Sequence, residues 1–201
     1  MSTLHALTTP TNNDSAHTLP TLRYKGGPLT HRPATIADLD QLSRLESECF
    51  PPEEAATRDQ ILYRIKTVPP ELFITTWDND KLVGFVNGTL TNSPDLTEES
   101  MSRHESKGST VCIHSVSVAP DLRRQGIAYT MLLNYIIGIK NVHRMRPTYK
   151  RIVLLAHDNL IPLYTKAGFK VDGPSGVHHG PLPWIQCSMM LGDGGWAHDD
   201  E

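Results

Sequence analysis

The sequence predicts a single mixed α/β domain, with a central sheet of about six or seven strands flanked by helices. Short apolar and β-branched runs, such as "ELFITTW" and "RIVLLAH", alternate with segments whose apolar residues recur at helical spacing. The 201 residues suffice for one domain with a substantial core. Hydrophobic residues make up 38% and charged residues 20% of the chain, as is usual for globular proteins.

The first predicted elements are two helices. Thr35 and Asp38 resemble a capping box, with Asp in place of the usual Glu. The helix that follows carries residues at helical spacing: Leu39, Leu42, Leu45 and Cys49. The sequence "FPPEE" then breaks the helical pattern, and Thr57 can cap the second helix.

Two strands and a loop come next. "ELFITTW" and "LVGFVNGTL" predict strands joined by the turn "DNDK", and "SPDLTEESMSRHESKGS" predicts a loop with one short helix. A third strand, "STVCIHSVSV", alternates in polarity. Strict alternation predicts two faces for it, Val111, Ile113, Ser115 and Ser117 on one, and Cys112, His114, Val116 and Val118 on the other.

The second half of the chain continues the pattern. A further helix carries apolar residues at helical spacing: Met131, Leu132, Tyr135 and Ile139. "RIVLLAH" is continuously apolar, which is typical of a strand covered on both faces. "NLIPLYTKAGF" predicts a short helix with Gly168 just past its C-cap, and "WIQCSMML" predicts the last strand.

The stretch "VAPDLRRQGIAYTMLLNYI" predicts an anion site between a strand and a helix. A helix start offers free N–H groups and partial positive charge, and Gly126 permits close backbone approach. Arg123 and Arg124 add charged donors. The P-loop motif and the three-glycine dinucleotide motif are both absent. The sequence therefore predicts a phosphate cradle of another kind, Arg123-x-x-Gly126-x-Ala128.

Two motifs resemble those of the GNAT N-acetyltransferases. "VSVAPDLRRQGIA" is similar to the acetyl-CoA motif of that family, Arg/Gln-x-x-Gly-x-Gly/Ala after a V-x-V strand, and "DNLIPLYTKAGF" is similar to its second signature. The resemblance implies the GNAT acyl-CoA N-acyltransferase fold and acetyl-CoA as co-substrate. It implies cofactor contacts at the strand end, the cradle and the second motif: Val116, Val118, Arg123, Arg124, Gln125, Gly126, Ile127, Ala128 and Asn159.

Within this family the chain resembles the arylalkylamine (serotonin) N-acetyltransferases over about residues 31–191, through "LTEESMSRHESKGSTVCIHSVSVAPDLRRQGIA" and "GPLPWIQCSMML". "ESECFPPEEAATRDQ" is similar to the non-vertebrate branch. The resemblance implies that His114 and Tyr164 are catalytic. The vertebrate branch has a further histidine where this chain has Cys112, so a two-histidine water relay is incomplete here. The implied amine-binding residues are Phe50, Pro51, Cys112 and Trp184.

The implied roles suit direct acetyl transfer. A primary amine with a pKa of about 10.4 must lose a proton before it attacks the thioester, and His114 is a suitable acceptor, directly or through water. The Tyr164 phenol, with an ordinary pKa of about 10, can protonate the departing CoA thiolate. A structural role remains an alternative for each residue. His114 could be a hydrogen-bonded histidine on a strand face, and Tyr164 could be an aromatic residue of the core.

Other functions stay open at this point. Glu53 and Glu54 favour a polyamine or other diamine as the acceptor. A non-catalytic CoA-binding or protein-interaction module on the same fold is a second alternative, and acetylation of a protein N-terminus or lysine is a third. Retention of both His114 and Tyr164 argues against the non-catalytic module.

The remaining sequence features limit the classes of partner that we expect for this chain. We interpret residues 1–27 as a flexible tail, 28–191 as the GNAT domain and 192–201 as an acidic tail. The formal net charge of -3 argues against nucleic-acid and membrane binding, and no run of about 18 apolar residues predicts a membrane helix. The vertebrate phospho-sites that bind adaptor proteins have no counterpart here. We expect a monomer that acts on a small-molecule amine.

The cysteines and the N-terminus indicate the compartment. The three cysteines are far apart in the sequence, so neither a disulfide framework nor a zinc motif is indicated. The first residues lack the basic start and apolar core of a secretory signal. We therefore expect a cytoplasmic protein without a metal.

Overall fold

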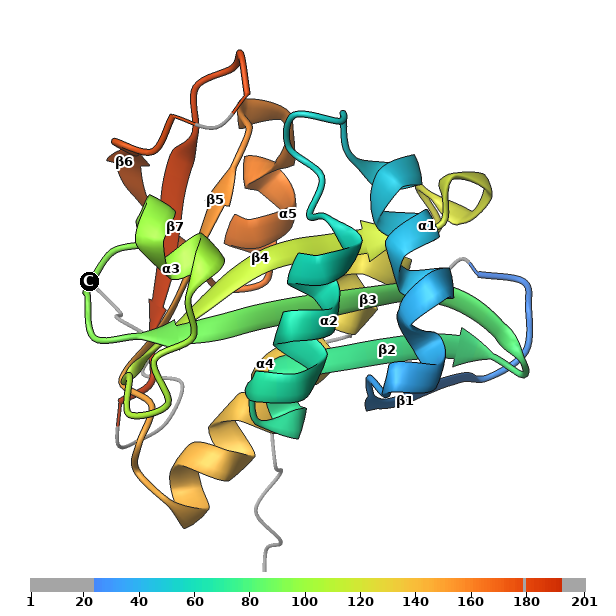
Figure 1. The fold of residues 1–201 in the computed structure, drawn as a ribbon, viewed down its shortest axis with the longest axis horizontal. Coiled ribbons are helices and arrows are strands. Elements are labelled where there is room, and N and C mark those ends of the chain that lie inside the picture. Colours follow the sequence, from blue (N-terminus) through green and yellow to red (C-terminus); the bar gives the residue numbers. More distant parts are fainter. Residues whose placement is uncertain (1–23, 179, 193–201) are drawn as a thin grey trace, which may run out of the picture.

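A computed structural model describes residues 24–178 and 180–192 of the chain (Figure 1). Its centre is a seven-stranded sheet with the strand order β1-β2-β3-β4-β5-β7-β6. The strands are β1 (Leu29–Pro33), β2 (Phe73–Asp78), β3 (Lys81–Thr91), β4 (Thr110–Val118), β5 (Arg151–Ala156), β6 (Lys170–Pro174) and β7 (Ile185–Met190). This sheet confirms the predicted mixed α/β class.

Helices occupy the connections between the strands. The α-helices are α1 (Leu39–Cys49), α2 (Arg58–Thr67), α3 (Glu98–Ser102), α4 (Ile127–Met145) and α5 (Ile161–Lys166). Short 3₁₀ turns are η1 (Ile36–Asp38), η2 (Pro70–Leu72), η3 (Pro120–Leu122) and η4 (Asp158–Leu160). Most of the tails predicted at residues 1–27 and 192–201 lies outside the described residues. Tyr24, inside the segment predicted as a tail, donates a hydrogen bond to Asp78.

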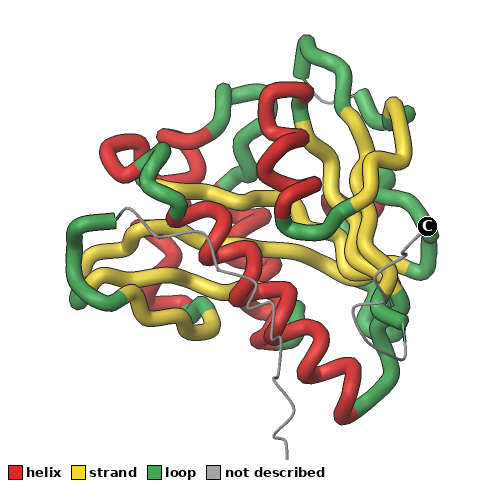
Figure 2. Tube along the Cα trace, turned by 180° about the vertical axis from the view of Figure 1, so that it is seen from behind, coloured by secondary structure: helices red, strands yellow, loops and turns green. Residues whose placement is uncertain are grey.

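The helices form a layer on each face of the sheet. The helices α1 and α2 cover one face (Figure 1), and α4 crosses the opposite face (Figure 2). The larger core cluster lies between the sheet and α4, and includes Val86, Val111, Ile113, Leu132 and Ile136. A second cluster lies beneath α1 and α2, and includes Leu39, Leu42, Leu45, Ile61 and Phe85.

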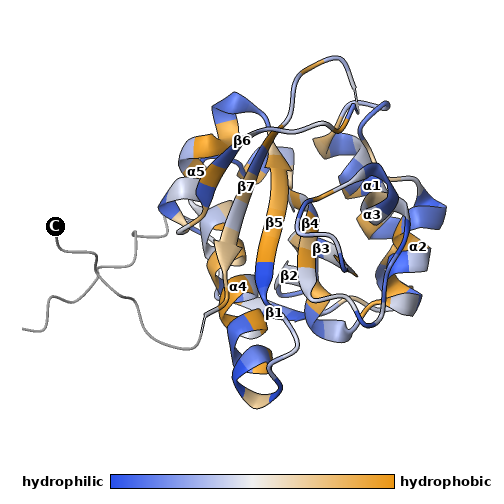
Figure 3. Cartoon of the chain, turned by 90° about the vertical axis from the view of Figure 1, so that its left-hand side faces the viewer, coloured by the Kyte–Doolittle hydropathy of each residue, from blue (hydrophilic) through white to orange (hydrophobic). Residues whose placement is uncertain are grey.

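Strand β5 is hydrophobic along most of its length, as Figure 3 shows. Ile152 and Leu154 belong to the core on the α4 side, whereas Val153 packs on the other side with Cys112. This arrangement confirms the sequence-based prediction of a strand covered on both faces. The edge strands β1 and β6 were not assigned from the sequence, because their half-exposed "LTHRP" and "KVDGP" lack an apolar pattern.

Several helix boundaries follow their predicted signals. Thr57 Oγ1 accepts a hydrogen bond from Gln60 N, which confirms Thr57 as the predicted cap of the second helix. Gln60 Oε1 in turn accepts from Thr57 N, which completes a capping box. Gly168 has a φ of +96° just past α5, as predicted. The capping box at Thr35 opens a 3₁₀ turn rather than an α-helix, and α1 begins only at Leu39.

The pairing of β4 changes twice along its length, and both changes position the site. Beside β3, the register passes from Gly88↔Ile113 to Asn87↔Ser115, which leaves His114 as the extra residue of a β-bulge. Beside β5, the parallel pairing covers only Thr110–Ile113. Figure 1 shows β4 and β5 diverging beyond this point.

The bulge overturns the prediction of strict alternation in β4. One extra residue reverses the faces of all the residues that follow it. Val116 and Val118 therefore join Val111 and Ile113 in the core on the α4 side. The residues after the bulge that face α1 are instead Ser115 and Ser117, which both contact Glu46.

Candidate active site

A cavity of about 40 Å³ lies beside the bulge, between α1, α3, β4 and β5. Its apolar wall consists of Phe50, Leu96, Met101, Ile113, Leu155 and Trp184. Its ionisable residues are Glu46, Glu54 and His114. The structure thus brings the predicted catalytic histidine together with both predicted aromatic residues.

Two residues predicted to bind substrate do not line this cavity. Pro51 is exposed in the loop after α1. Cys112 is buried in an apolar cluster with Leu96, Val153 and Val177, and of these only Leu96 lines the cavity. Burial raises the pKa of the Cys112 thiol to about 12, so the thiol stays protonated at neutral pH. Cys112 is therefore a poor proton acceptor.

His114 is held by a neighbouring strand. Its Nε2 lies 2.8 Å from Thr89 Oγ1 on β3, and its buried Nδ1 has no hydrogen-bond partner among the described residues. Burial and the charge of Arg64 lower the pKa of His114 well below its ordinary value. The ring is therefore neutral at physiological pH and has an acceptor nitrogen.

Glu46 was not singled out from the sequence. It is 1% exposed, and its carboxylate accepts hydrogen bonds from Ala56 N (3.1 Å), Ser115 Oγ (2.9 Å) and Ser117 Oγ (3.2 Å). Burial raises its pKa although these donors favour the charged form. One signal could have found it, since Glu46 lies four residues after Leu42 and therefore on the apolar stripe of α1.

A second buried charge lies beneath the cavity. Arg64 on α2 is 4% exposed and donates to Asn87 Oδ1 and to Met101 O, both at 3.0 Å. Burial lowers its pKa to about 10, and the charge of Glu46 works in the opposite direction. The opposite charges of Arg64 and Glu46 offset part of the cost of burying each other.

Three loops meet at one side of the cavity. The ring of His157, at the end of β5, stacks on Trp184 with a centroid distance of 3.8 Å. Its Nδ1 is 3.1 Å from Pro183 O, and its Nε2 is 3.4 Å from Glu54 Oε2. His157, which the sequence did not indicate, therefore joins the loop before β7 to the loop after α1.

The predicted phosphate cradle has the backbone of an anion-binding turn. Arg124 has a φ of +64° and Gly126 a φ of +87°, and α4 begins at the next residue, Ile127. Left-handed residues ahead of a helix start turn successive N–H groups into one concavity. A left-handed backbone conformation at a residue other than glycine, such as Arg124, costs about 1–3 kcal/mol of conformational free energy, and such strain is concentrated at functional sites. Gln125 and Ala128, which are half-buried, flank the glycine.

Arg123 is directed away from this turn. Its Nε donates to Val118 O at 3.3 Å, and the Cys49 thiol approaches the same oxygen at 3.4 Å. The structure therefore connects Arg123 with the end of β4, whereas Arg124 is exposed at the cradle.

The diverging strands leave part of β4 open. Ala119 N–H donates to Val83 O, so by alternation the backbone groups of Val116 and Val118 point away from β3. Because β5 pairs only as far as Ile113 of β4, these groups face the opening between β4 and β5. This edge offers an extended ligand the hydrogen bonds of an added strand.

Tyr164 lies on α5, which packs into the core on the α4 side. It is 6% exposed, and its ring meets Phe169 edge-on at 6.1 Å. Its hydroxyl makes no hydrogen bond to any described residue. Burial raises its pKa, so the phenol keeps its proton at neutral pH. Asn159, predicted beside the cofactor arm, is exposed in η4.

Neither a cluster of metal ligands nor a membrane-spanning helix is present among the described residues. No three His, Cys, Asp or Glu side chains within them are grouped as a metal site would require. None of the helices that the structure describes has the length and hydropathy to cross a membrane. The absence of a metal cofactor and the cytoplasmic location stay predictions.

The chain is similar to known acetyltransferases in sequence. A model of the acetyltransferase (GNAT) family matches residues 39–169. The serotonin N-acetyltransferase of Mesocricetus auratus is 34% identical over 125 residues, which cover 61% of this chain and 58% of that protein. The enzyme of the same name from Homo sapiens is 28% identical over 125 residues, covering 62% and 58%.

A bacterial relative extends the comparison. The uncharacterized N-acetyltransferase YkwB of Bacillus subtilis is 29% identical over 158 residues, covering 72% of this chain and 66% of that protein. The matched part of the chain thus spans less than two thirds of the length of each of these relatives. The assignment to the non-vertebrate branch stays a prediction.

Solved structures share the fold. The loading GNATL domain of CurA from Lyngbya majuscula has a TM-score of 0.70 at 16% identity, covering 82% of this chain and 98% of that domain. YncA from Salmonella typhimurium, determined with its cofactor acetyl-CoA, has a TM-score of 0.61 at 15% identity, covering 87% and 100%. These likenesses confirm the predicted GNAT fold.

Proposed function

The chain belongs to the GNAT family of acetyltransferases, and we propose that it transfers the acetyl group of acetyl-CoA directly to a primary arylalkylamine. One observation carries the proposal: a single cavity combines His114 with the aromatic side chains of Phe50 and Trp184. The similarity to proteins named serotonin N-acetyltransferases supports an amine such as serotonin, tryptamine or phenylethylamine.

Acetyl-CoA would bind along the opening between β4 and β5. The pantetheine arm pairs, as an added strand would, with the backbone of Val116 and Val118 on the side that β5 leaves open. It would share or displace the contacts that Arg123 and Cys49 make with the Val118 carbonyl. The pyrophosphate lies on the turn at Gly126 and the first N–H groups of α4, with Arg124 as a charged donor. The acetyl-CoA in the Salmonella relative supports this choice of cofactor.

The amine proton leaves before or during attack. The neutral His114 ring accepts it, directly or through water, and the freed nitrogen lone pair forms the new N–C bond with the acetyl carbon. The C–S bond breaks, and the electron pair leaves on the CoA sulfur. The phenol of Tyr164, which burial keeps protonated and which has no hydrogen-bond partner among the described residues, supplies the thiolate with a proton.

An arylalkylamine requires movement at the cavity. The volume of about 40 Å³ is far below the roughly 300–1,000 Å³ of typical ligand pockets. Phe50 and Trp184 belong to loops rather than to helices or strands, so their displacement enlarges the cavity without disturbing the sheet. The aromatic faces then enclose the aryl group and tolerate the nearby ammonium.

A diamine or polyamine is the second candidate acceptor. Glu46 and Glu54 both line the cavity, and carboxylates in an apolar wall favour a ligand with a second positive charge. Glu53, which the sequence also suggested for this role, is exposed and does not line the cavity. Only Glu54 of the predicted pair therefore supports this alternative.

A substrate panel separates the two candidates. Release of free CoA is measured with acetyl-CoA and tryptamine, serotonin, phenylethylamine, spermidine, lysine or a peptide. We expect the highest kcat/KM with an arylalkylamine. A clearly higher kcat/KM for spermidine than for tryptamine would assign the diamine function instead, and the absence of turnover with every amine would contradict both.

A further inference from the structure

The hydroxyl of Thr89 lies between His114 and α3. Thr89 is completely buried on β3, and its Oγ1 is 2.8 Å from Ser100 O and 2.8 Å from His114 Nε2. A threonine hydroxyl carries a single hydrogen, and a backbone carbonyl only accepts. The hydrogen of Thr89 is therefore committed to Ser100, which leaves a lone pair for His114.

This geometry determines which nitrogen of His114 carries hydrogen. Because Thr89 Oγ1 accepts, His114 Nε2 must donate to it. In the neutral ring the other nitrogen, Nδ1, then holds the lone pair. Nδ1 is buried without a hydrogen-bond partner among the described residues, and His114 is one of the residues that line the candidate cavity.

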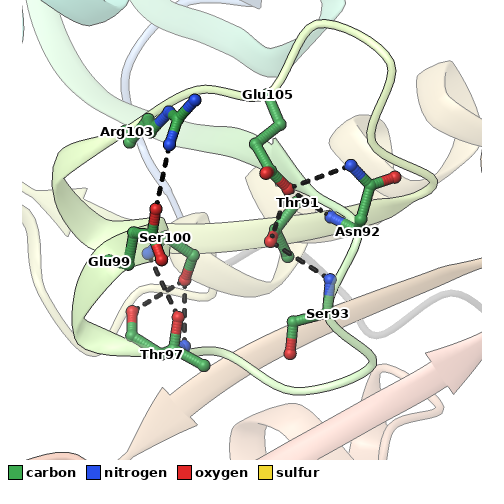
Figure 4. Close-up of a pocket in the computed structure, with 8 residues that line it drawn as sticks. All are labelled: Thr91, Asn92, Ser93, Thr97, Glu99, Ser100, Arg103 and Glu105. Carbon is green, nitrogen blue, oxygen red and sulfur yellow. Dashed lines mark hydrogen bonds and ion pairs between the residues drawn. The ribbon is translucent and has the colours of Figure 1, made fainter.

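The carbonyl of Ser100 is itself held in place. Thr97 Oγ1 accepts from Ser100 N at 3.2 Å, and Thr97 N donates to Ser100 Oγ at 2.9 Å. Figure 4 shows this reciprocal pair at the start of α3, beside the ion pair between Glu99 and Arg103, the residue that follows the helix. These bonds order the turn that presents the Ser100 carbonyl to Thr89, and because a carbonyl cannot donate, the hydrogen between the two oxygens belongs to Thr89.

We infer that Thr89 is a positioning residue that holds His114 in the Nε2–H tautomer, so that Nδ1 is the atom that takes the proton of the acceptor amine. The inference rests on the acetyl transfer proposed above. When Nδ1 takes the proton, the ring carries hydrogen on both nitrogens, and Nε2–H keeps its bond to Thr89. The ring therefore needs no rotation during the transfer.

A purely structural role for Thr89 makes a different prediction. If the hydroxyl only satisfied a buried imidazole, its removal would cost stability but would leave the rate of the folded enzyme unchanged. If it positions the ring, its removal lowers kcat in protein that remains folded. Thr91, two residues along the same strand, provides a matched control. It is 6% exposed, and its hydroxyl donates to Glu105 at 3.0 Å (Figure 4).

The kinetic test compares three variants with the amine that the wild-type enzyme turns over best. Thr89→Val should lower kcat by about 10- to 100-fold, a part of the roughly 10²–10⁴-fold that general base catalysis contributes, and should change the KM for acetyl-CoA little. Thr89→Ser, which keeps the hydroxyl, should restore most of the rate. Thr91→Val should stay within about twofold of wild type, because it removes a hydroxyl that does not contact His114.

The second test determines the tautomer of His114 directly, in protein without substrate. NMR of protein labelled with ¹⁵N in its histidines should show, for His114, a protonated Nε2 and an unprotonated Nδ1 at neutral pH. The signals are assigned by their loss in His114→Gln. A protonated Nδ1 in the wild type would overturn the inference, as would a folded Thr89→Val with the wild-type kcat.

The two tests also separate this inference from the proposed function. If no amine is acetylated, the proposed function fails, and the NMR signals still show which nitrogen Thr89 leaves free. If Thr89→Val does not fold, the comparison of Thr89→Ser with wild type and the wild-type spectrum decide the question. A Thr89→Ser enzyme with much lower kcat and a protonated Nδ1 would contradict the positioning role.

Discussion

Ser115 Oγ donates a hydrogen bond of 2.9 Å to Glu46 Oε1, across 69 positions of sequence. The contact joins α1 to the residue of β4 that follows His114. The same carboxylate also accepts from Ser117 and from the backbone of Ala56. One buried side chain thus connects the helix, the loop that carries Phe50, and the strand beside the candidate cavity.

Replacing Glu46 by alanine should reduce the free energy of unfolding by about 2–4 kcal/mol, since each buried donor left without a partner costs about 1–3 kcal/mol. Urea unfolding followed by circular dichroism measures the change. The control is Glu48→Ala on the exposed side of the same helix, which should stay within about 0.5 kcal/mol of wild type. Equal losses in the two variants would show that Glu46 has no special structural role.

Gly126→Val should weaken acetyl-CoA binding by at least tenfold, about 1.4 kcal/mol. The φ of +87° excludes a β-branched residue without a change in the turn that we propose for the pyrophosphate. Isothermal titration with CoA measures the affinity. Gly138→Ala in the same helix, where an added Cβ meets no neighbour, should leave the affinity unchanged. An unchanged affinity in folded Gly126→Val would exclude this turn as the phosphate site.

Tyr164→Phe tests the role of the phenol. The ring keeps its packing against Phe169, so the melting temperature should change little. If the hydroxyl protonates the thiolate, kcat should fall by about 10²–10⁴-fold while acetyl-CoA affinity stays close to normal. A variant that unfolds, or that loses affinity and rate together, would identify Tyr164 as a packing residue. Wild-type kcat with a rate-limiting chemical step would exclude the general-acid role.

The rate should rise between about pH 6 and pH 9, because the small neutral fraction of an amine with a pKa near 10.4 grows roughly tenfold with each pH unit in this range. A histidine with the ordinary pKa of about 6.5 would titrate within the same range. The structure lowers its pKa well below the ordinary value through burial and Arg64, so the ring is already neutral there. His114→Gln should therefore lower the rate throughout the range and keep the slope. Loss of the slope in this variant would show that His114 itself titrates there.

The low pKa of His114 also affects stability at acid pH. The unfolded chain binds this proton more readily than the folded one, so the stabilisation is complete above the unfolded pKa of about 6.5 and is lost as the pH falls below it. Thermal unfolding at a series of pH values should show a shallower acid decline for His114→Gln than for wild type. Parallel curves would indicate that other groups dominate the decline.

The sequence predicted those parts of the fold that local chemistry determines. Thr57 caps α2 through its own hydroxyl, and Gly168 ends α5 through its left-handed backbone, so each is visible in a short window. The bulge at His114 was missed because it depends on the pairing of β3 with β4, which single-strand alternation cannot reveal. It reversed the predicted faces of Ser115 and Val116.

The residues of the candidate site likewise fall into two groups, those that the sequence predicted and those that it missed. Phe50, His114 and Trp184 were predicted from motif resemblance, and all three line the cavity. Glu46 and His157 were missed because their importance arises from partners far away in the sequence, Ser115 and Glu54. Long-range contacts of this kind need the tertiary structure.

The opening beside Val116 and Val118 gives the sheet an edge within the molecule rather than at its rim. Exposed strand edges are templates on which other chains can assemble, and proteins usually protect them. In the proposed complex the pantetheine arm provides this protection. At a concentration 100 times its Kd, a ligand stabilises a protein by about 2.7 kcal/mol. The supply of acetyl-CoA would then set the stability of the chain as well as its rate, so that the enzyme without the cofactor unfolds more readily than the loaded one.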